Sequence, residues 1–182
     1  ENTTFRNLAQ EAILSVASTS VSGSVFLTKG VVPDPLGSPA IPYGGIRVIA
    51  PSGVVTLVDN QLDGMGRGAI NVLGNNDGDV ALATINGNEI SRVTAGSGIV
   101  VSDTQEAVLE GNIIADIDHA TDDDGGISNG YGLACFRVAS CAMNGNDVSE
   151  AEFSNFVGVD SNFTSVADSF HDGWYQGAHL ES

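Results

Sequence analysis

The residues whose types and spacing come closest to a chemical site are the carboxylates of one short segment. Asp118, Asp122, Asp123 and Asp124 lie close together, and two glycines follow them. Several carboxylate oxygens within one loop are the ligands that calcium prefers. The spacing is neither that of an EF-hand nor that of a nonapeptide calcium repeat, so the alternative is a solvated acidic turn. Calcium is therefore the only cofactor that the sequence suggests.

Two cysteines, Cys135 and Cys141, stand among apolar residues and have neither a CxxC nor a zinc-ligand spacing. Two interpretations stay open for them. They are either small core residues or a disulfide across a turn, which requires an oxidising exterior.

Aromatic residues mark the end of the chain. The tail of residues 170–182 holds Trp174, the only tryptophan, and Tyr175. We expect the tail to fold over the end of the domain as a cap. The alternative is a platform on which the two rings stack against a carbohydrate.

The excess of acidic residues argues against partners that are themselves negatively charged. With 23 acidic residues against 6 basic ones, the formal net charge is −17. Such a chain repels phosphate backbones and anionic lipids, so we expect no binding to nucleic acid. No run of apolar residues is long enough to span a bilayer, so no membrane insertion is expected. Because the sequence begins at Glu1, we interpret it as a processed product or a piece of a longer polypeptide.

An internal repeat indicates how these residues are positioned. The segments GIVVSDTQEAVLEGN, from Gly98, and GLACFRVASCAMNGN, from Gly132, align without a gap. Extending this register over the chain gives six columns of similar residues. The two columns of a first strand are Ile13, Ile46, Ile70, Ile99, Leu133 and Phe156, and then Ser15, Val48, Val72, Val101, Cys135 and Gly158. Those of a second strand are Val25, Val55, Ala83, Ala107, Cys141 and Thr164, and then Leu27, Leu57, Ile85, Leu109, Met143 and Val166.

A polar column follows the second strand and precedes a third. It consists of Gly30, Asn60, Asn88, Asn112, Asn146 and Ser169, and two residues further on stand Val32, Leu62, Ile90, Ile114, Val148 and His171. Alternating pairs separated by breaks are typical of a coil with three flat sides, which buries its apolar side only by stacking on its neighbours. The asparagines fit an internal ladder of side-chain amides. The sequence thus predicts an all-β, right-handed parallel β-helix of about six coils, either a single domain over residues 1–182 or a segment of a longer solenoid.

Three insertions and the start of the chain interrupt the pattern. We expect loops at residues 33–45, 74–79 and 115–132. Asn2 stands in the ladder register, so the chain is expected to begin partway through a coil. The alternative is a short helix over residues 4–14 with Thr4 as its N-cap.

The phrases VALATINGNEISRVTAGSGIVV and EAVLEGNIIADI resemble the repeats of bacterial cell-surface β-helices, including autotransporter passenger domains and adhesins. More broadly the pattern is similar to the pectate-lyase-like superfamily. Lyases of that superfamily use an Arg or Lys base beside calcium-binding carboxylates on one outward strand face, and its hydrolases use three aspartates with a histidine. Here the corresponding face offers only Arg47. The sequence therefore favours a protein that is not an enzyme, with a polysaccharide-active or carbohydrate-binding β-helix as the alternative.

The outward positions of the first strand are mainly apolar, with Val100, Phe136, Val157 and Val159 in adjacent coils. Exposed apolar patches of more than a few hundred Å² usually mark an interface. We expect these four residues to contact other copies of the chain or neighbouring domains of a longer chain. Together with the resemblance, this predicts an extracellular or cell-surface structural or adhesive segment, self-associating or part of a larger surface protein or filament.

Overall fold

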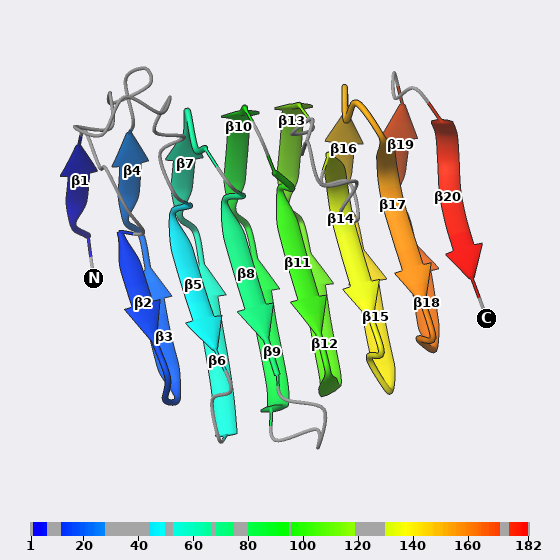
Figure 1. The fold of residues 1–182 in the computed structure, drawn as a ribbon, viewed down its shortest axis with the longest axis horizontal. Coiled ribbons are helices and arrows are strands. Elements are labelled where there is room, and N and C mark those ends of the chain that lie inside the picture. Colours follow the sequence, from blue (N-terminus) through cyan, green and yellow to red (C-terminus); the bar gives the residue numbers. More distant parts are fainter. Residues whose placement is uncertain are drawn as a thin grey trace, which may run out of the picture.

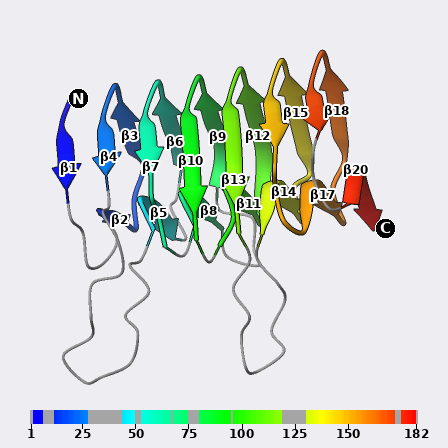
Figure 2. The same ribbon diagram turned by 90° about the horizontal axis from the view of Figure 1, so that it is seen from above.

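The computed structural model describes residues 2–6, 12–27, 44–49, 53–66, 68–74, 80–94, 96–118, 130–171 and 175–181. Over these residues the chain is all-β, and its strands stack in three parallel sheets, here named A, B and C. Each coil runs through sheet B, then sheet C, then sheet A, and the next coil repeats the order (Figures 1 and 2). The fold is the predicted right-handed parallel β-helix of about six coils.

Sheets A and B contain seven strands each and sheet C contains six. Sheet A contains β1 (Thr4–Arg6), β4 (Val25–Leu27), β7 (Gln61–Asp63), β10 (Glu89–Val93), β13 (Ile113–Ile117), β16 (Asp147–Ser149) and β19 (Ser169–His171). Sheet B contains β2 (Ile13–Ser15), β5 (Ile46–Ile49), β8 (Ile70–Leu73), β11 (Ile99–Ser102), β14 (Tyr131–Phe136), β17 (Ser154–Val159) and β20 (Tyr175–Glu181). Sheet C contains β3 (Thr19–Ser22), β6 (Gly53–Val58), β9 (Val80–Asn86), β12 (Thr104–Glu110), β15 (Ser140–Asn144) and β18 (Phe163–Val166).

The inward columns of sheet B have the predicted register in all six coils. Ile99, for example, pairs with Ile70 on one side and with Leu133 on the other. The side chains of these columns are fully buried through the middle coils, where they meet the inward columns of sheets A and C in one continuous core. Strand alternation therefore decides which residues enter the core, as the repeat predicts.

The predicted register is wrong for sheets C and A in the first coil. The residues found in the predicted columns are Thr19 in place of Val25, Val21 in place of Leu27, Ser24 in place of Gly30 and Phe26 in place of Val32. The reason is the length of chain between the two strands. Three residues separate Ser15 from Thr19 in this coil, whereas six separate their partners in the next coil, Val48 and Val55. Gly30 and Val32 lie outside the described residues. The glycine that makes the turn is Gly23, whose φ is +57°.

The predicted register is also wrong, by one residue, in the last coil. The residues found are Phe163 in place of Thr164, Ser165 in place of Val166, Asp168 in place of Ser169 and Phe170 in place of His171. Three residues, 160–162, lie between Val159 and Phe163, whereas four residues, 137–140, lie between their partners in the preceding coil, Phe136 and Cys141. One residue fewer moves every later side chain by one position.

The described parts of the N-terminal segment, at both ends of the alternative helix, are strands. Residues 4–6 form β1, which pairs in parallel with β4, and residues 13–15 form β2. The rings of Phe5 and Phe26 stack with centroids 4.8 Å apart. Since Thr4 pairs with Val25, the ladder position belongs to Thr3, and the prediction for Asn2 is wrong by one residue.

Asn60, Asn88, Asn112 and Asn146 form the predicted buried ladder, with at most 1% of each residue exposed. Each Oδ1 accepts the backbone N–H of the preceding ladder residue at 3.1 Å, and the Nδ2 of a preceding asparagine also donates to it. The second N–H of each Nδ2 donates to a backbone carbonyl of the adjacent coil, such as that of Ile85 for Asn112. The ladder ends on Asp168, whose Oδ1 accepts both the N–H and the Nδ2 of Asn146.

The glycines that open strands of sheet B are required by close packing. A Cβ added to Gly98 would lie 2.6 Å from the carbonyl oxygen of Gly132 and 2.7 Å from Cγ2 of Ile114. A Cβ added to Gly132 would meet Val148 in the same way. The apolar side chain that follows the ladder thus fills the space beside each glycine, which explains why the repeat begins with Gly.

We predict that Asn112→Leu destabilises the protein despite its greater hydrophobicity. The substitution leaves the N–H and Nδ2 of Asn88, the carbonyl of Ile85 and Oδ1 of Asn146 without the amide of Asn112. A buried polar group that loses its partner costs about 1–3 kcal/mol. Urea unfolding measures the loss. Asn144→Leu, at an exposed site, is the control and should stay within about 0.5 kcal/mol of the wild type. Equal effects of the two substitutions would contradict the role of the ladder.

We also predict that two glycine substitutions differ in their cost. Gly98→Ala should lower the free energy of unfolding by about 3 kcal/mol, because its Cβ clashes with backbone that cannot move away. Gly111→Ala places its Cβ in open space, so only the left-handed backbone at φ +61° is penalised, by about 1–2 kcal/mol. Thermal melting of both variants measures the difference. A milder loss for Gly98→Ala than for Gly111→Ala would be inconsistent with this packing.

Candidate functional site

The predicted calcium ligands lie mostly outside the described residues. Asp118 is exposed after β13, and its backbone N–H donates to the carbonyl of Val93 at 2.7 Å. Asp122, Asp123 and Asp124 belong to the segment that the structure does not describe. Among the residues that it does describe, no three His, Cys, Asp or Glu side chains are grouped so as to hold a metal ion. Calcium binding therefore stays a prediction.

The predicted carbohydrate residues are placed only in part. Trp174 lies outside the described residues, and Tyr175 is the first residue of β20, described by its backbone alone. This strand pairs in parallel with β17 and so adds a further strand to sheet B beyond the sixth coil (Figure 1). The stacking of aromatic rings on a sugar stays a prediction.

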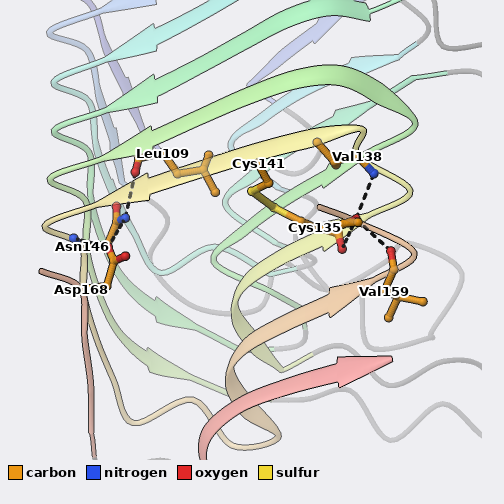
Figure 3. The surroundings of a disulfide bond; sticks show 8 residues. Leu109, Cys135, Val138, Cys141, Asn146, Val159 and Asp168 are labelled. Atoms are coloured by element: carbon orange, nitrogen blue, oxygen red, sulfur yellow. Dashed lines mark hydrogen bonds between the residues drawn. A yellow bond between two sulfur atoms is a disulfide. The ribbon is translucent and has the colours of Figure 1, made fainter. Parts of the chain in front are cut away.

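Cys135 and Cys141 are joined by a disulfide, as the second interpretation of the pair predicted. Both residues belong to inward columns and are buried, so they are core residues as well. The bond spans the corner between β14 and β15, with Cα atoms 7.0 Å apart (Figure 3). At the same corner the Ser161 hydroxyl accepts the Val138 N–H at 2.9 Å and lies 3.1 Å from the carbonyl oxygen of Cys135. The disulfide and the serine together fix how the chain turns from sheet B to sheet C.

A second apolar cluster lies on the face of sheet B that is turned away from the core. Here we name it the outer cluster; it consists of Val100, Tyr131, Ala134, Phe136, Phe153, Val157 and Val159. The four predicted interface residues belong to it. Pairing of β11 with β14 and of β14 with β17 aligns Val100 with Ala134 and Ala134 with Val157, so the side chains become neighbours. The structure therefore brings together the residues that the sequence grouped.

Aromatic rings close over the centre of the outer cluster. The Tyr131 ring meets those of Phe153 and Phe136 edge-on, with centroids 5.3 and 5.9 Å apart. Ala134 and Val157 are only 0% and 3% exposed, although they point away from the core. Phe136, Phe153, Val100 and Val159 remain half-buried at the surface.

The outer cluster covers fewer coils than the sequence predicted. Toward the N-terminus, the same face carries Asn71 on β8 and Arg47 on β5, and Leu14 is isolated and 61% exposed. The strand residues of the outer cluster therefore belong to β11, β14 and β17. In the second outward column, Ser102 separates Phe136 from the apolar residues Leu73 and Ile49 of β8 and β5. Arg47 lies between Leu14 and Asn71 in the register, so its cross-strand neighbours supply none of the carboxylates that a lyase-type site needs.

Sequence reasoning missed Tyr131 and Phe153, which supply much of the outer cluster. Both precede the repeat unit of their coils, where the column alignment assigned no positions. The signal available was the spacing, because in each case an aromatic residue stands two or three residues before the first inward position of sheet B, Leu133 or Phe156.

Two arginine–aspartate pairs border the corners of the coils. Arg137, which has φ +52°, donates from Nε and Nη2 to the two carboxylate oxygens of Asp103, at 2.6 and 2.8 Å. These hydrogen bonds hold the pKa of Asp103 below its usual range. Arg92 likewise donates from Nε and Nη2 to the two carboxylate oxygens of Asp63, and these hydrogen bonds lower the pKa of that carboxyl group. Each pair links one coil to the preceding coil.

Comparison with protein-family models, with curated proteins and with solved structures finds no significant match to this chain. Its class is therefore defined by its own architecture, the parallel β-helix. The described residues also include no helix of the length and apolarity needed to cross a membrane.

We predict that the Asp103–Arg137 pair makes stability depend on pH. Its contribution is complete above the unfolded-state pKa of aspartate, about 3.9, and is lost as the pH falls through the lower pKa of the folded state. Because Arg137 is largely exposed, Arg137→Met should cost only about 0.5–1 kcal/mol at neutral pH. Urea unfolding from about pH 7 to about pH 2 should show that cost shrinking in acid. A cost that is independent of pH would show that packing of the side chain, and not the ion pair, is responsible.

Proposed function

We propose that this chain is a non-enzymatic structural or adhesive segment of a β-helix at the cell exterior, and that it contacts other polypeptides through the outer cluster. The observation that carries the proposal is a second apolar cluster on the outside of a solenoid whose core is already filled. Phe136, Phe153, Val100 and Val159 stay partly exposed to solvent there. Apolar side chains grouped in this way on a rigid sheet favour contact with a partner.

Two further features support the exterior location. A buried disulfide joins Cys135 to Cys141, and disulfides persist in oxidising compartments. The repeats also resemble those of bacterial cell-surface β-helices and, more broadly, the pattern is similar to the pectate-lyase-like superfamily. Parallel stacking in three sheets suits a rod, because each coil contacts only its neighbours.

The partner that the sequence suggested was another copy or a neighbouring domain of a longer chain, and salt provides a direct test of the surface. At about 1 M salt, charges are screened beyond about 3 Å, so repulsion between copies of net charge −17 no longer opposes an apolar contact. We expect the wild-type chain to self-associate under these conditions in sedimentation velocity. Phe136→Asp should remain folded and monomeric, because a charge at the centre of the contact would have to be desolvated.

The matched control is Val108→Asp, which places the same charge on the outward side of β12 in sheet C, where Val108 is also half-buried. This variant should associate like the wild type. The proposal fails if the two variants behave alike, or if wild-type chains stay monomeric at high salt. Unfolding of Phe136→Asp would show that Phe136 is part of the core.

A further inference from the structure

Two segments of the chain share the tripeptide Ser-Asn-Phe, and their asparagines have opposite environments. Asn155 is 0% exposed; its Oδ1 accepts the N–H of Ala151 at 3.3 Å and its Nδ2 donates to the carbonyl of His171 at 3.0 Å. Asn162 is exposed at the corner between β17 and β18 (Figure 1), where its Nδ2 donates to the carbonyl of Ala139 at 3.1 Å. The first asparagine therefore belongs to the packed interior, whereas the second presents its amide at the surface.

The residues around Asn162 form an acceptor sequence for N-linked glycans. Thr164, two positions later, carries the hydroxyl that the N-x-Thr sequon requires, whereas the buried copy has Val157 at the equivalent position. Asp160, two positions before, is the acidic residue that the more selective oligosaccharyltransferases also require. Another N-x-Thr sequon begins at Asn2, but the sequence has an acidic residue two positions before the asparagine only in the first case.

The fold exposes all three of these side chains at one corner. Asp160, Asn162 and Thr164 are exposed, whereas Ser161 hydrogen-bonds within the corner and Phe163 packs against the core. Thr164 pairs with the outward Ala142 and stands on β18, which is the last strand of sheet C among those described. A transferase therefore meets the carboxylate, the amide and the hydroxyl without having to displace a core residue.

We propose that Asn162 is a site of N-linked glycosylation, with Asp160 and Thr164 as the residues that the transferase recognises. The donor is an oligosaccharide that is joined through pyrophosphate to a membrane lipid. Nδ2 of Asn162 forms a C–N bond to the anomeric carbon, and the bond from that carbon to the pyrophosphate oxygen breaks. A basic group of the transferase takes the Nδ2 proton, and the lipid pyrophosphate leaves.

The local structure is compatible with the product. An amide Nδ2 carries two hydrogens, and the transfer replaces one of them, so the hydrogen bond to the carbonyl of Ala139 can be retained. A bulky, solvated glycan suits an exposed corner. The buried disulfide between Cys135 and Cys141 supports the same compartment, because thiol oxidation and this glycan transfer both take place outside the cytosol. The site is separate from the outer cluster and does not depend on it.

The test produces the whole chain in bacterial cells that export it and that contain an oligosaccharyltransferase requiring the acidic residue, together with its lipid-linked oligosaccharide. A second exported protein with an established acceptor sequon shows that the transferase is active. Intact mass spectrometry of the purified chain should show the addition of one glycan. Peptide mapping should place that glycan on Asn162.

Substitutions in the sequon separate recognition from chance modification. Asn162→Gln and Thr164→Val should abolish the modification, whereas Thr164→Ser keeps the hydroxyl and should retain it. Asp160→Asn removes a charged contact with the transferase and should lower the rate of modification by about tenfold or more. Glu106→Gln removes an exposed acidic side chain elsewhere on sheet C, so it is the matched control and should leave the modification unchanged.

Folding is checked for every variant by circular dichroism and thermal melting, because Asp160 also attracts Arg137 within the chain. The glycosylated chain should melt within about 2 °C of the unmodified chain, since the glycan is attached to an exposed side chain.

Three outcomes would overturn the inference. They are an unmodified Asn162 when the second exported protein is glycosylated, equal modification of the wild type and Asp160→Asn, and a glycosylated chain that no longer folds. None of these results bears on association at high salt, so the contact through the outer cluster stands or fails by its own test.

Discussion

The structure depends on the asparagine ladder, because the ladder satisfies polar groups that have no other partner inside the coil. At each corner between sheets C and A the chain reverses in a single left-handed residue, such as Gly87 or Gly111, and then enters the core. The amide of the next residue donates to the carbonyl that points inward and accepts the N–H of the adjacent coil. A buried backbone group without such a partner would cost more than most single contacts contribute. Every ladder amide therefore fixes both its own corner and the register of the next coil.

The ladder also has a direction. One N–H of each asparagine Nδ2 donates to the ladder residue of the next coil toward the C-terminus, so the final position must accept hydrogen bonds and has no further ladder residue to which to donate. Asp168 meets that requirement, since a carboxylate accepts and does not donate. Its other oxygen accepts the Ser165 hydroxyl at 2.6 Å. An acidic residue at this position is thus explained by hydrogen bonding and needs no metal site.

Sequence periodicity predicted the inward residues correctly where the corner between two strands has the same length in adjacent coils. It failed where the length of a corner changes. The columns through Ile46, Ile70, Ile99 and Leu133 were correct because strand alternation and burial act on every member. In the last coil, Phe163 and Thr164 have equally plausible side chains for an inward position, and only the loss of one corner residue selects Phe163. Corner length is set by backbone conformation, including left-handed residues such as Asp160 and Ala167, which periodicity does not reveal. The sequence predicted the members of the outer cluster that lie within the repeat. It missed Tyr131 and Phe153, because both stand at positions outside the repeat.

A repeating coil has a consequence for surfaces as well as for the core. Once the ladder and the inward columns fix the register, outward positions of adjacent strands become neighbours whatever residues occupy them. Val100, Ala134 and Val157 are separated by long stretches of sequence and yet form one surface. A few substitutions at equivalent positions thus create an apolar surface without disturbing the fold, because the outward side chains contribute little to the core. The same reasoning accounts for the limits of the outer cluster. Asn71 and Arg47 continue the column of Val100 with polar side chains, and Ser102 interrupts the column of Phe136 before Leu73 and Ile49.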